Sequence, residues 1–475
     1  MAGLRPTYTH ARAASYARAG GPWDVPGLDE VLTAASIEVV DGSARLSADA
    51  LEAAVASRAG WLRSQAVGPG DVVAWQLPNG LDAYLLYRAC WRLGAVAAPV
   101  HHAAGPADVK ATIEQVRPAL VVSAGAGLGT PVGVGSVDAD TLAVVLFTSG
   151  SSGRPKAVLH THRGLVYKAR TMTAVHGLSG ADAVIMPAPL AHISGLLNGV
   201  LVPGVAGMKT VLMSRWEPDR ALSLIAAEGV TFMIGPPTFF VSLMDAPGFG
   251  AERVAPLRLV SSGGAGVTPA FVARAASTLE CTVKRTYGST EVPTVTTSTA
   301  SDPPDKAATT DGRATGEAEV RIVDGEVQLR GPEVFVGYVD ADLTTAAFTD
   351  DGWFRTGDLG LLDPEGWLTI TGRMKDVIIR GGENITASEV EAALEAHPVV
   401  LHAAAVGYPD ERLGQRVCAF VVASGPFDLE ACRAWMESRG VTRFKWPERV
   451  VQVPSLPLLA AGKIDRAALE RLAAQ

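Results

Sequence analysis

Thr148-Ser149-Gly150-Ser151-Ser152-Gly153-Arg154-Pro155-Lys156 directly follows an apolar run, residues 142–147, that has the composition of a buried strand. Glycine at 150 and 153 lets the backbone approach an anion closely and adopt positive φ. The hydroxyl groups and free backbone N–H groups of the loop can donate to phosphate oxygens, and Lys156 adds a positive charge. The stretch predicts a phosphate-binding loop at the end of a buried strand in an α/β fold.

Two other interpretations of this loop compete with phosphate binding. A Ser/Gly surface linker has a similar composition, but a linker seldom follows a continuous apolar strand and ends on Pro-Lys. A Walker-type loop requires Gly-x-x-x-x-Gly-Lys-Ser/Thr. Here Lys156 follows Pro155 and precedes Ala157, so the Walker pattern fails.

Elsewhere the chain alternates between strand and helix patterns, which indicates a largely parallel sheet covered by helices. The strands expected from apolar runs are residues 72–77, 96–100, 142–147, 230–234 and 257–260, and the helices are residues 51–64, capped by Ser47, residues 81–93, and one that begins near Thr161 or Arg163. From about residue 320 short strands and turns predict a small β-rich subdomain. We predict a large N-terminal domain of α/β subdomains, residues 1–373, and a small mobile α+β C-terminal domain, residues 374–475.

Composition narrows the class of protein. The chain has 475 residues, of which 48% are apolar and 19% charged, and its formal net charge is −8, so two or three globular domains without a nucleic-acid-binding basic surface are expected. The four scattered cysteines argue against a disulfide framework and a cysteine zinc site. The N-terminus has no secretory signal, and the longest apolar stretch, residues 196–208, is too interrupted to span a bilayer. A cytoplasmic protein is predicted.

Further motifs follow the loop in a fixed order: Tyr287-Gly288-Ser289-Thr290-Glu291, Gly352-Trp353-Phe354-Arg355-Thr356-Gly357-Asp358-Leu359, Gly372-Arg373-Met374-Lys375-Asp376 with Gly381-Gly382-Glu383-Asn384-Ile385, and Ala461-Gly462-Lys463-Ile464-Asp465. With the loop, this series resembles the adenylate-forming superfamily of acyl-CoA synthetases, peptide-synthetase adenylation domains and firefly luciferase, and it is closest to acyl-CoA ligases. The resemblance covers about residues 40–470. One departure is Ala157, where many members have glycine.

The resemblance implies a two-step reaction that uses ATP, Mg²⁺ and CoA. A carboxylic acid attacks the α-phosphate, pyrophosphate leaves, and the acyl-AMP then passes its acyl group to a thiol. The implied nucleotide-site roles are the 148–156 loop on the β- and γ-phosphates, Thr290 on the α-phosphate, Glu291 on Mg²⁺, Tyr287 and Gly288 beside adenine, Asp358 on the ribose hydroxyls, Arg373 on ribose or phosphate, and Gly263 and Gly264 along adenine and the acyl group. Lys463 is implied to bridge carboxylate and phosphate in the adenylation step.

Each of these residues also has an ordinary structural interpretation. Taken alone, Glu291 is typical of a solvated or helix-capping carboxylate, Asp358 of a turn aspartate, and Lys463 of a solvated charge. His192 resembles a residue that borders the acyl pocket and the thiol entry, and a buried structural histidine is the alternative. His160-Thr161-His162 is a weak metal pattern, for which a role near the nucleotide or plain packing is favoured.

The family uses its C-terminal domain in two arrangements. In one, Lys463 enters the site for adenylation. In the other, the domain has turned about a hinge at Lys375, and Gly381 and Gly382 line a channel for the pantetheine arm, where a side chain would block a narrow tunnel.

The choice of acid is constrained near His192. Amino-acid-activating relatives carry an aspartate there for the substrate ammonium, whereas this chain has Ile193 and Ser194. An apolar pocket is predicted from Leu196, Leu197, Met233, Ile234 and Phe239, which suits a fatty, aromatic or alicyclic acid. The alternatives left open are loading of a carrier-protein phosphopantetheine, a nucleotide sensor with a dead site and, remotely, luciferase-like oxidation. A homodimer is also left open.

Overall fold

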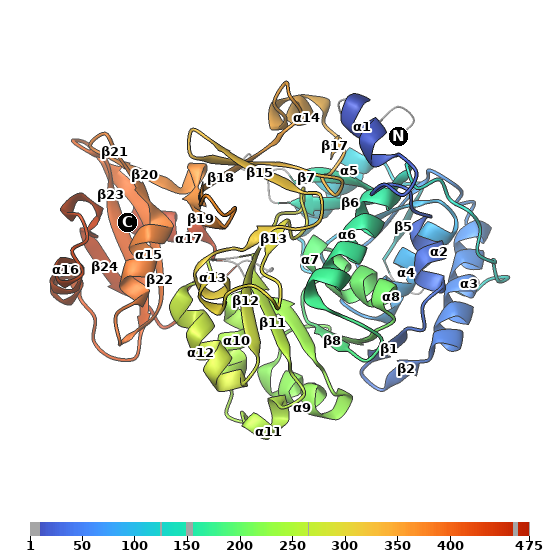
Figure 1. Ribbon diagram of the computed structural model, residues 1–475, viewed down its shortest axis with the longest axis horizontal. Helices are drawn as coiled ribbons and strands as arrows, with labels where there is room; N and C mark the ends of the chain where they lie inside the picture. Colours follow the sequence, from blue (N-terminus) through green and yellow to red (C-terminus); the bar gives the residue numbers. More distant parts are fainter. Residues whose placement is uncertain (1–9, 124–125, 149–154, 265, 459–463, 475) are drawn as a thin grey trace.

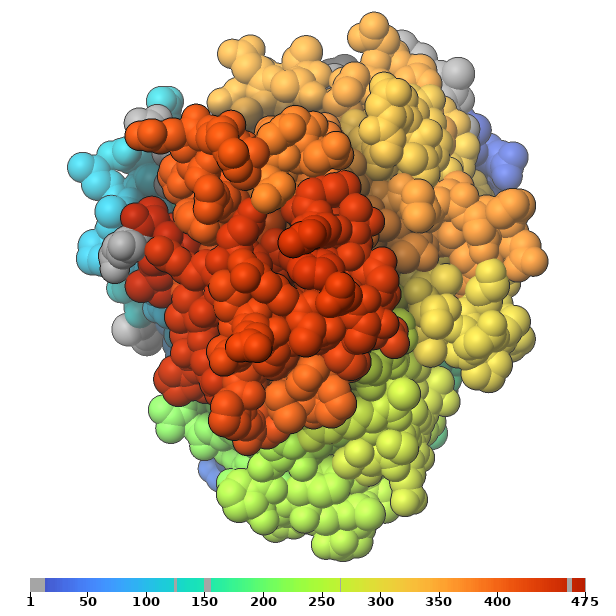
Figure 2. All heavy atoms as spheres, turned by 90° about the vertical axis from the view of Figure 1, so that its left-hand side faces the viewer, coloured from blue at the N-terminus to red at the C-terminus, as the bar shows by residue number. Residues whose placement is uncertain are grey.

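The computed structural model describes residues 10–123, 126–148, 155–264, 266–458 and 464–474. A large N-terminal domain contains three of the four sheets, and a small C-terminal domain, orange to red in Figure 1, contains the fourth. Figure 2 views the C-terminal end of the molecule, where the small domain forms a continuous face beside the yellow-green helices of the large domain. The exact boundary at residue 374 stays a prediction.

The first sheet has nine strands in the order β14-β13-β12-β11-β10-β8-β9-β1-β2. Its central strands pair in parallel, from β1 through β9, β8, β10 and β11 to β12. The bounds are β1 (Glu38–Asp41), β2 (Ala44–Leu46), β8 (Ala183–Met186), β9 (Lys209–Leu212), β10 (Phe232–Gly235), β11 (Leu259–Gly263), β12 (Thr282–Tyr287), β13 (Thr296–Thr297) and β14 (Arg313–Ala314).

The second sheet has six strands in the order β17-β7-β6-β4-β3-β5. Its bounds are β3 (Val72–Trp75), β4 (Val96–Pro99), β5 (Leu120–Val122), β6 (Leu142–Thr148), β7 (Lys156–Thr161) and β17 (Gly337–Tyr338). Strands β3 to β6 pair in parallel as expected, but β7 returns antiparallel to β6. The expectation of a loop running straight into a helix is therefore incomplete, because residues 156–161 form a strand first.

The helices of the large domain surround these two sheets (Figure 1). Their bounds are α1 (His10–Tyr16), α2 (Leu28–Thr33), α3 (Ala48–Ser64), α4 (Leu81–Arg92), α5 (Pro106–Val116), α6 (His162–His176), α7 (Ile193–Leu196), the π-helix η1 (Leu197–Leu201), α8 (Val202–Ala206), α9 (Pro218–Glu228), α10 (Pro237–Met244), α11 (Ala251–Val254), α12 (Pro269–Leu279), α13 (Pro304–Thr309) and α14 (Ala341–Ala347). Ser47 caps α3 and Thr161 caps α6, each by accepting a bond from a backbone N–H of the first turn. Both predicted helix starts are confirmed.

The predicted β-rich subdomain is an antiparallel four-stranded sheet in the order β15-β16-β18-β19. Its bounds are β15 (Glu319–Val323), β16 (Glu326–Arg330), β18 (Phe354–Leu362) and β19 (Leu368–Arg373). Strand β18 pairs Asp358 with Arg373 of β19, so the third and fourth sequence motifs lie side by side.

The small domain is built around an antiparallel pair of long strands, β22 and β23. Its bounds are the 3-10 helix η2 (Met374–Asp376), β20 (Val377–Arg380), β21 (Glu383–Thr386), α15 (Ala387–Glu395), β22 (Val400–Asp410), β23 (Gly414–Ala423), α16 (Leu429–Ser438), the 3-10 helix η3 (Arg443–Lys445), β24 (Arg449–Gln452) and α17 (Arg466–Ala473). Two hydrophobic clusters drawn only from residues after 376 form its core. This domain therefore buries its apolar side chains independently of the large one.

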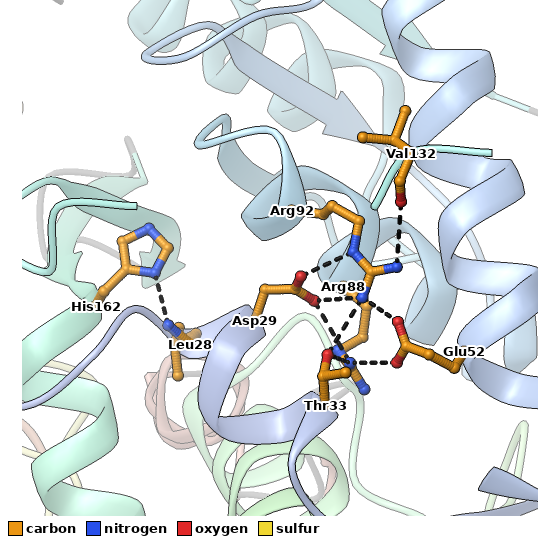
Figure 3. A network of polar contacts seen from close by, with 8 residues as sticks. All are labelled: Leu28, Asp29, Thr33, Glu52, Arg88, Arg92, Val132 and His162. Carbon is orange, nitrogen blue, oxygen red and sulfur yellow. Dashed lines mark hydrogen bonds and ion pairs between the residues drawn. The ribbon is translucent and has the colours of Figure 1, made fainter. Parts of the chain in front are cut away.

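Residues 10–37, to which the sequence assigns no role, are anchored to the large domain. Asp29 of α2 lies between two buried arginines of α4 (Figure 3), and its carboxylate pairs with Arg92 at 2.8 Å and with Arg88 at 3.4 Å. Glu52 of α3 pairs with the same two arginines. Trp23 donates its indole N–H to the Pro332 carbonyl at 2.9 Å. These contacts hold the segment against α3, α4 and the loop after β16.

No helix within the described ranges is long and apolar enough to cross a membrane, and the apolar stretch at residues 196–208 folds into α7, η1 and α8 instead. All four cysteines are unpaired thiols. The predictions of no disulfide framework and no apolar span in that stretch agree with these findings.

Candidate active site

Four neighbouring parallel strands of the first sheet end at the same edge. Strand β8 leads to His192, β10 to Phe239, β11 to Gly263 and Gly264, and β12 ends at Tyr287. The carboxyl edge of a parallel sheet is where ligands of α/β proteins usually bind, because loops and helix starts gather there. The topology therefore brings four separately predicted sites to one edge.

Glycine is required along this edge for packing. A Cβ atom on Gly263 would lie 2.3 Å from the Thr286 carbonyl oxygen, and one on Gly288 would lie 2.3 Å from the backbone nitrogen of Thr294. Gly264 has φ +78°, which L side chains rarely adopt. These positions keep the loops after β11 and β12 close to one another, with little side-chain bulk between them.

Tyr287, Asp358 and Arg373 form a hydrogen-bonded set that we call the ribose cluster, after the role that the sequence resemblance predicts for Asp358. The Tyr287 hydroxyl donates to Oδ2 of Asp358 at 2.7 Å, and Nε of Arg373 lies 2.8 Å from Oδ1. Asp358 is 3% exposed, whereas the Arg373 side chain is 48% exposed. Burial and the neighbouring carboxylate raise the pKa of Tyr287 well above its usual value, so the hydroxyl stays a donor. Three predicted residues from three strands thus meet.

Thr290 and Glu291 are held by three donors. Nε2 of His160, on β7, donates to the Thr290 carbonyl at 2.7 Å, and the backbone N–H of Phe335 donates to the Glu291 carbonyl at 2.8 Å. The Tyr338 hydroxyl donates to Oε1 of Glu291 at 2.8 Å. Burial lowers the pKa of His160 to about 4, so the ring is neutral at pH 7. His160 thus contacts the backbone of the second motif, and a role near the nucleotide stays a prediction beside plain packing.

Lys156 lies at the base of the predicted phosphate loop. Thr148 and Lys156 are directly paired at the loop end of the β6–β7 hairpin, and the Lys156 ammonium nitrogen lies 5.2 Å from the centre of the Tyr338 ring. The intervening loop residues Ser149, Gly150, Ser151, Ser152 and Gly153 lie outside the described residues. Through Tyr338, Lys156 is close to Glu291 and therefore to the second motif.

His192 forms the N-cap of α7, and its ring lies against another histidine that the sequence analysis did not single out. The ring centres of His192 and His101 are 5.1 Å apart, and His101 stacks on His102 at 4.5 Å. His101 follows β4 in the second sheet, so this contact joins the edges of the two sheets. Burial, with the neighbouring His102, lowers the pKa of His101 to about 4.

The predicted apolar pocket needs a correction. Leu196, Leu197 and Ile234 belong to the large core between the two sheets, and Phe239 packs against that core. Met233 belongs to a different cluster, which packs against α9, α10 and α12. Adjacent residues of a strand point to opposite faces, so Met233 and Ile234 cannot line the same pocket. The assignment of Met233 is wrong.

The comparisons with known proteins bear directly on this arrangement. The AMP-binding enzyme family matches residues 32–134 and 126–339, and the AMP-binding enzyme C-terminal domain matches residues 389–463. The chain belongs to the AMP-binding enzyme family. It is 31% identical to a medium-chain fatty-acid–CoA ligase of Escherichia coli (strain K12), over 98% of this chain and 93% of that protein.

Two further similarities span nearly the whole AMP-binding enzyme. A salicylyl-CoA synthase / salicylate adenylyltransferase of a Streptomyces species is 33% identical over 91% of this chain and 90% of that protein. The crystal structure of ATP-bound MatB from Rhodopseudomonas palustris has a TM-score of 0.86 and 25% identity, over 94% of this chain and 98% of that chain. The predicted family and the predicted fold, with a large N-terminal and a small C-terminal domain, are confirmed.

Of the predicted C-terminal residues of this AMP-binding enzyme, Lys375, Gly381 and Gly382 fall within the described residues. Lys375 is in η2, directly after β19, and Lys463 lies outside the described residues. Gly381 and Gly382 form the exposed turn between β20 and β21, with φ +59° and +89°. In this arrangement both glycines are exposed, and their place in a pantetheine channel stays a prediction. Their positive φ gives a second reason for glycine besides the predicted narrow tunnel.

No group of three or more histidine, cysteine or acidic side chains in the described ranges could hold a metal ion. Mg²⁺, however, is commonly held by one or two carboxylates together with substrate phosphates. Glu291, partly exposed and near Lys156, offers one such carboxylate, so the donor set fits a magnesium ion that arrives with a nucleotide.

Proposed function

We propose that this protein is an ATP-dependent acid–thiol ligase that forms acyl-AMP and pyrophosphate from a hydrophobic carboxylic acid and then an acyl-CoA thioester. The observation that carries the proposal is the convergence of side chains from distant parts of the chain. Tyr287, Asp358 and Arg373 are joined by hydrogen bonds, and Glu291 is joined through Tyr338 to Lys156. These are the groups that adenylate formation requires on one nucleotide.

The ribose cluster supplies recognition of the nucleoside. A carboxylate can accept about four hydrogen bonds, and Tyr287 and Arg373 use one on each oxygen of Asp358. We assign this carboxylate to the two ribose hydroxyls, from which it would accept bonds beside Tyr287 and Arg373. The Tyr287 ring, fixed by its bond to Asp358, offers a flat face to adenine beside Gly263 and Gly264. Arg373 adds positive charge at the same edge.

The phosphate side of the nucleotide is served by Lys156, Thr290, Glu291 and the 148–156 loop. Thr290 donates to the α-phosphate, and Lys156 with the loop binds the β- and γ-phosphates that leave as pyrophosphate. Glu291 would hold a Mg²⁺ ion that arrives with the nucleotide, and the ion would supply neutralisation of phosphate charge. Catalysis is then mostly positioning and charge neutralisation, because the attacking carboxylate oxygen needs no base. Lys463 bridges the acid and the α-phosphate in this step.

The acid is hydrophobic. An α-amino acid would need a carboxylate to pair with its ammonium group, and the first turn of α7, which begins beside His192, carries no acidic residue. At the end of β10 the rings of Phe239 and Trp216 stack at 4.8 Å and present an aromatic surface. The names of the two similar proteins indicate that one acts on a medium-chain fatty acid and the other on salicylate. These names support a fatty, aromatic or alicyclic acid.

In the second half-reaction the small domain turns about Lys375 and brings Gly381 and Gly382 against the large domain, where they border the pantetheine arm. His192 and its neighbour His101 border the path of the thiol. The thiol sulfur attacks the acyl carbonyl, and AMP leaves. CoA is the favoured thiol, because the similar proteins are named for CoA thioesters. A carrier-protein phosphopantetheine is the alternative.

A panel of fatty, aromatic and alicyclic acids, incubated with ATP, Mg²⁺ and CoA, tests the proposal. Pyrophosphate release and mass spectrometry of the thioesters identify the acid and the thiol together. We expect at least one acid to give both pyrophosphate and a CoA thioester, and amino acids to give neither.

Three outcomes separate the alternatives. Absence of pyrophosphate with every acid would reject adenylation and favour a nucleotide sensor. Pyrophosphate without CoA thioester, but with acylation of a phosphopantetheinylated carrier protein, would establish the carrier as the acceptor. Oxidation of an added luciferin with light emission in air would favour the luciferase-like alternative.

A further inference from the structure

Tyr338 is the residue around Glu291 to which neither the sequence motifs nor the proposed function assigns a role. It ends β17, where it pairs with Val158 of β7, two residues from Lys156. Its side chain is 4% exposed, and its hydroxyl donates to Oε1 of Glu291 at 2.8 Å across 47 residues of sequence. The same ring faces the Lys156 ammonium group at 5.2 Å. One side chain therefore touches both the predicted metal ligand and the predicted phosphate-binding lysine.

The scaffold, not Glu291, fixes the position of this ring. The Tyr338 backbone N–H donates to the Thr344 hydroxyl at 2.8 Å, and the ring packs edge-on against Phe335 with centres 4.8 Å apart. Phe335 in turn donates its backbone N–H to the Glu291 carbonyl. The segment 335–338 thus holds Glu291 at two points, its backbone through Phe335 and its carboxylate through Tyr338.

Such an arrangement orients a metal ligand before the metal arrives. A free glutamate side chain samples several rotamers, and a donor on one carboxylate oxygen selects those that keep the bond. The bond occupies one of about four acceptor sites, so the carboxylate keeps capacity for a cation. Partners that hydrogen-bond to metal ligands typically contribute about 10–100-fold to metal affinity.

We propose that Tyr338 is a positioning residue that orients the Glu291 carboxylate for the magnesium ion of Mg-ATP. This inference rests on the proposed function, because it needs a nucleotide-bound metal. The tyrosine acts through Glu291 and does not itself touch ATP or the acid. Its ring also holds the Lys156 ammonium by a cation–π contact, which a phenylalanine would keep.

The test separates ATP binding from metal binding. Calorimetric titration of ATP in EDTA and in Mg²⁺ gives two dissociation constants. The ratio of the constant in EDTA to the constant in Mg²⁺ measures how much the metal tightens ATP binding. For Tyr338→Phe we expect the constant in EDTA to be unchanged and the ratio to fall about tenfold. The Mg²⁺ concentration that gives half-maximal pyrophosphate release should rise by a similar factor.

Tyr167→Phe is the matched control. The Tyr167 hydroxyl, on α6, accepts a hydrogen bond from the Glu317 backbone at 2.6 Å, so this variant also loses one tyrosyl hydrogen bond. It should leave both dissociation constants unchanged. Glu291→Gln tests whether Tyr338 acts through Glu291. In the Glu291→Gln variant, adding Tyr338→Phe should lower the ratio no further, since the oriented carboxylate is already gone.

Two outcomes for this ratio would overturn the inference. An unchanged ratio in Tyr338→Phe would mean that the hydroxyl does not orient the ligand, and if both dissociation constants rise equally, Tyr338 has a structural role alone. A higher ratio would mean that the hydroxyl competes with the metal. If the parent protein itself gains no affinity from Mg²⁺, the proposed function fails as well, whereas a responsive parent with an equally responsive variant refutes only the role of Tyr338.

Discussion

The ribose cluster and the β20–β21 turn contrast sharply in how they are held. Asp358 is buried, and both of its oxygens are bonded to side chains from other strands. Gly381 and Gly382 lie on the surface of the small domain, where a Cβ on Gly382 would meet nothing within 4 Å. Both regions contain predicted site residues, yet only the first is assembled by contacts within its own domain.

This difference indicates that the ribose cluster suits ATP binding, whereas the small domain suits a movement that selects the half-reaction. Hydrogen-bonded groups that are ordered before the ligand arrives lower the entropic cost of binding, which suits recognition of ATP. Exposed groups on a small domain with its own core can be brought to the site by a rigid-body rotation at little packing cost. We therefore expect substitutions in the ribose cluster to weaken nucleotide binding, and those in the small domain to affect one half-reaction at a time.

The largest effect is expected for Lys463→Ala. Removal of the ammonium that is proposed to bridge acid and phosphate should slow acyl-AMP formation ~100–1,000-fold, the usual loss for one transition-state charge contact. Thioester formation from supplied acyl-AMP should be largely spared, because the proposed rotation of the small domain would take Lys463 out of the site before the thiol arrives. Stopped assays of the two half-reactions measure both rates.

Lys110→Ala, the exposed lysine of α5, should alter neither half-reaction. Equal loss of both steps in Lys463→Ala would contradict the two-arrangement assignment of the small domain.

Asp358→Ala is expected to raise the dissociation constant for ATP about 10–100-fold. The net loss of one hydrogen bond to a charged group costs ~1.5–3 kcal/mol, which is about 10–100-fold in affinity, and the variant also releases Tyr287 and Arg373. Calorimetric titration with ATP measures the change. Asp363→Ala, which removes a turn carboxylate paired with Lys306, is the matched control and should keep ATP affinity. Unchanged affinity in Asp358→Ala would exclude the ribose assignment.

Gly382→Ala should slow only the thiol step, about five- to tenfold. Alanine at φ +89° carries a strain of ~1–2 kcal/mol, which shifts the turn that is proposed to border the pantetheine arm. Gly440→Ala is closely matched, because Gly440 also lies in the small domain at φ +65°, and a Cβ there would likewise meet nothing within 4 Å. If both variants slow thioester formation equally, the effect is general destabilisation of the domain.

The sequence predicted the members of the site better than their partners. Tyr287, Asp358, Glu291 and Arg373 each belong to a linear motif whose spacing is visible without a structure. Tyr338 belongs to no such motif, because its relation to Glu291 depends on the pairing of β17 with β7. A short strand such as β17 has too few residues to give a periodic signal.

The errors have a similar physical origin. Residues 156–161 read as the end of a loop, since a strand of six residues that begins with lysine does not stand out from its neighbours. The assignment of Met233 to the pocket rests on composition alone. The alternation of β10 sends it to the core on the opposite face from Ile234, and only the register of the strand reveals that.

The smallest effect is expected for Glu395 of the small domain. Burial raises its pKa to about 7, although its carboxylate accepts a bond from the Ala403 backbone N–H. The unfolded chain ionises this group near its ordinary value of 4.5, so between about pH 4.5 and 7 folding retains a proton that the unfolded state loses. The stabilising contribution is present at low pH and is lost as pH rises through 7.

Glu395→Gln stays neutral at every pH and keeps an acceptor for Ala403. We expect it to raise the stability of the small domain by ~1 kcal/mol at pH 8, after allowance for solvent screening of a partly exposed group, and by nothing at pH 4. Hydrogen exchange of the β22 and β23 amides measures the small domain separately from the large one. Glu389→Gln is the matched control, since Glu389 is an exposed carboxylate of the same helix. A gain at pH 8 that persists undiminished at pH 4 would show that the effect does not come from protonation of Glu395.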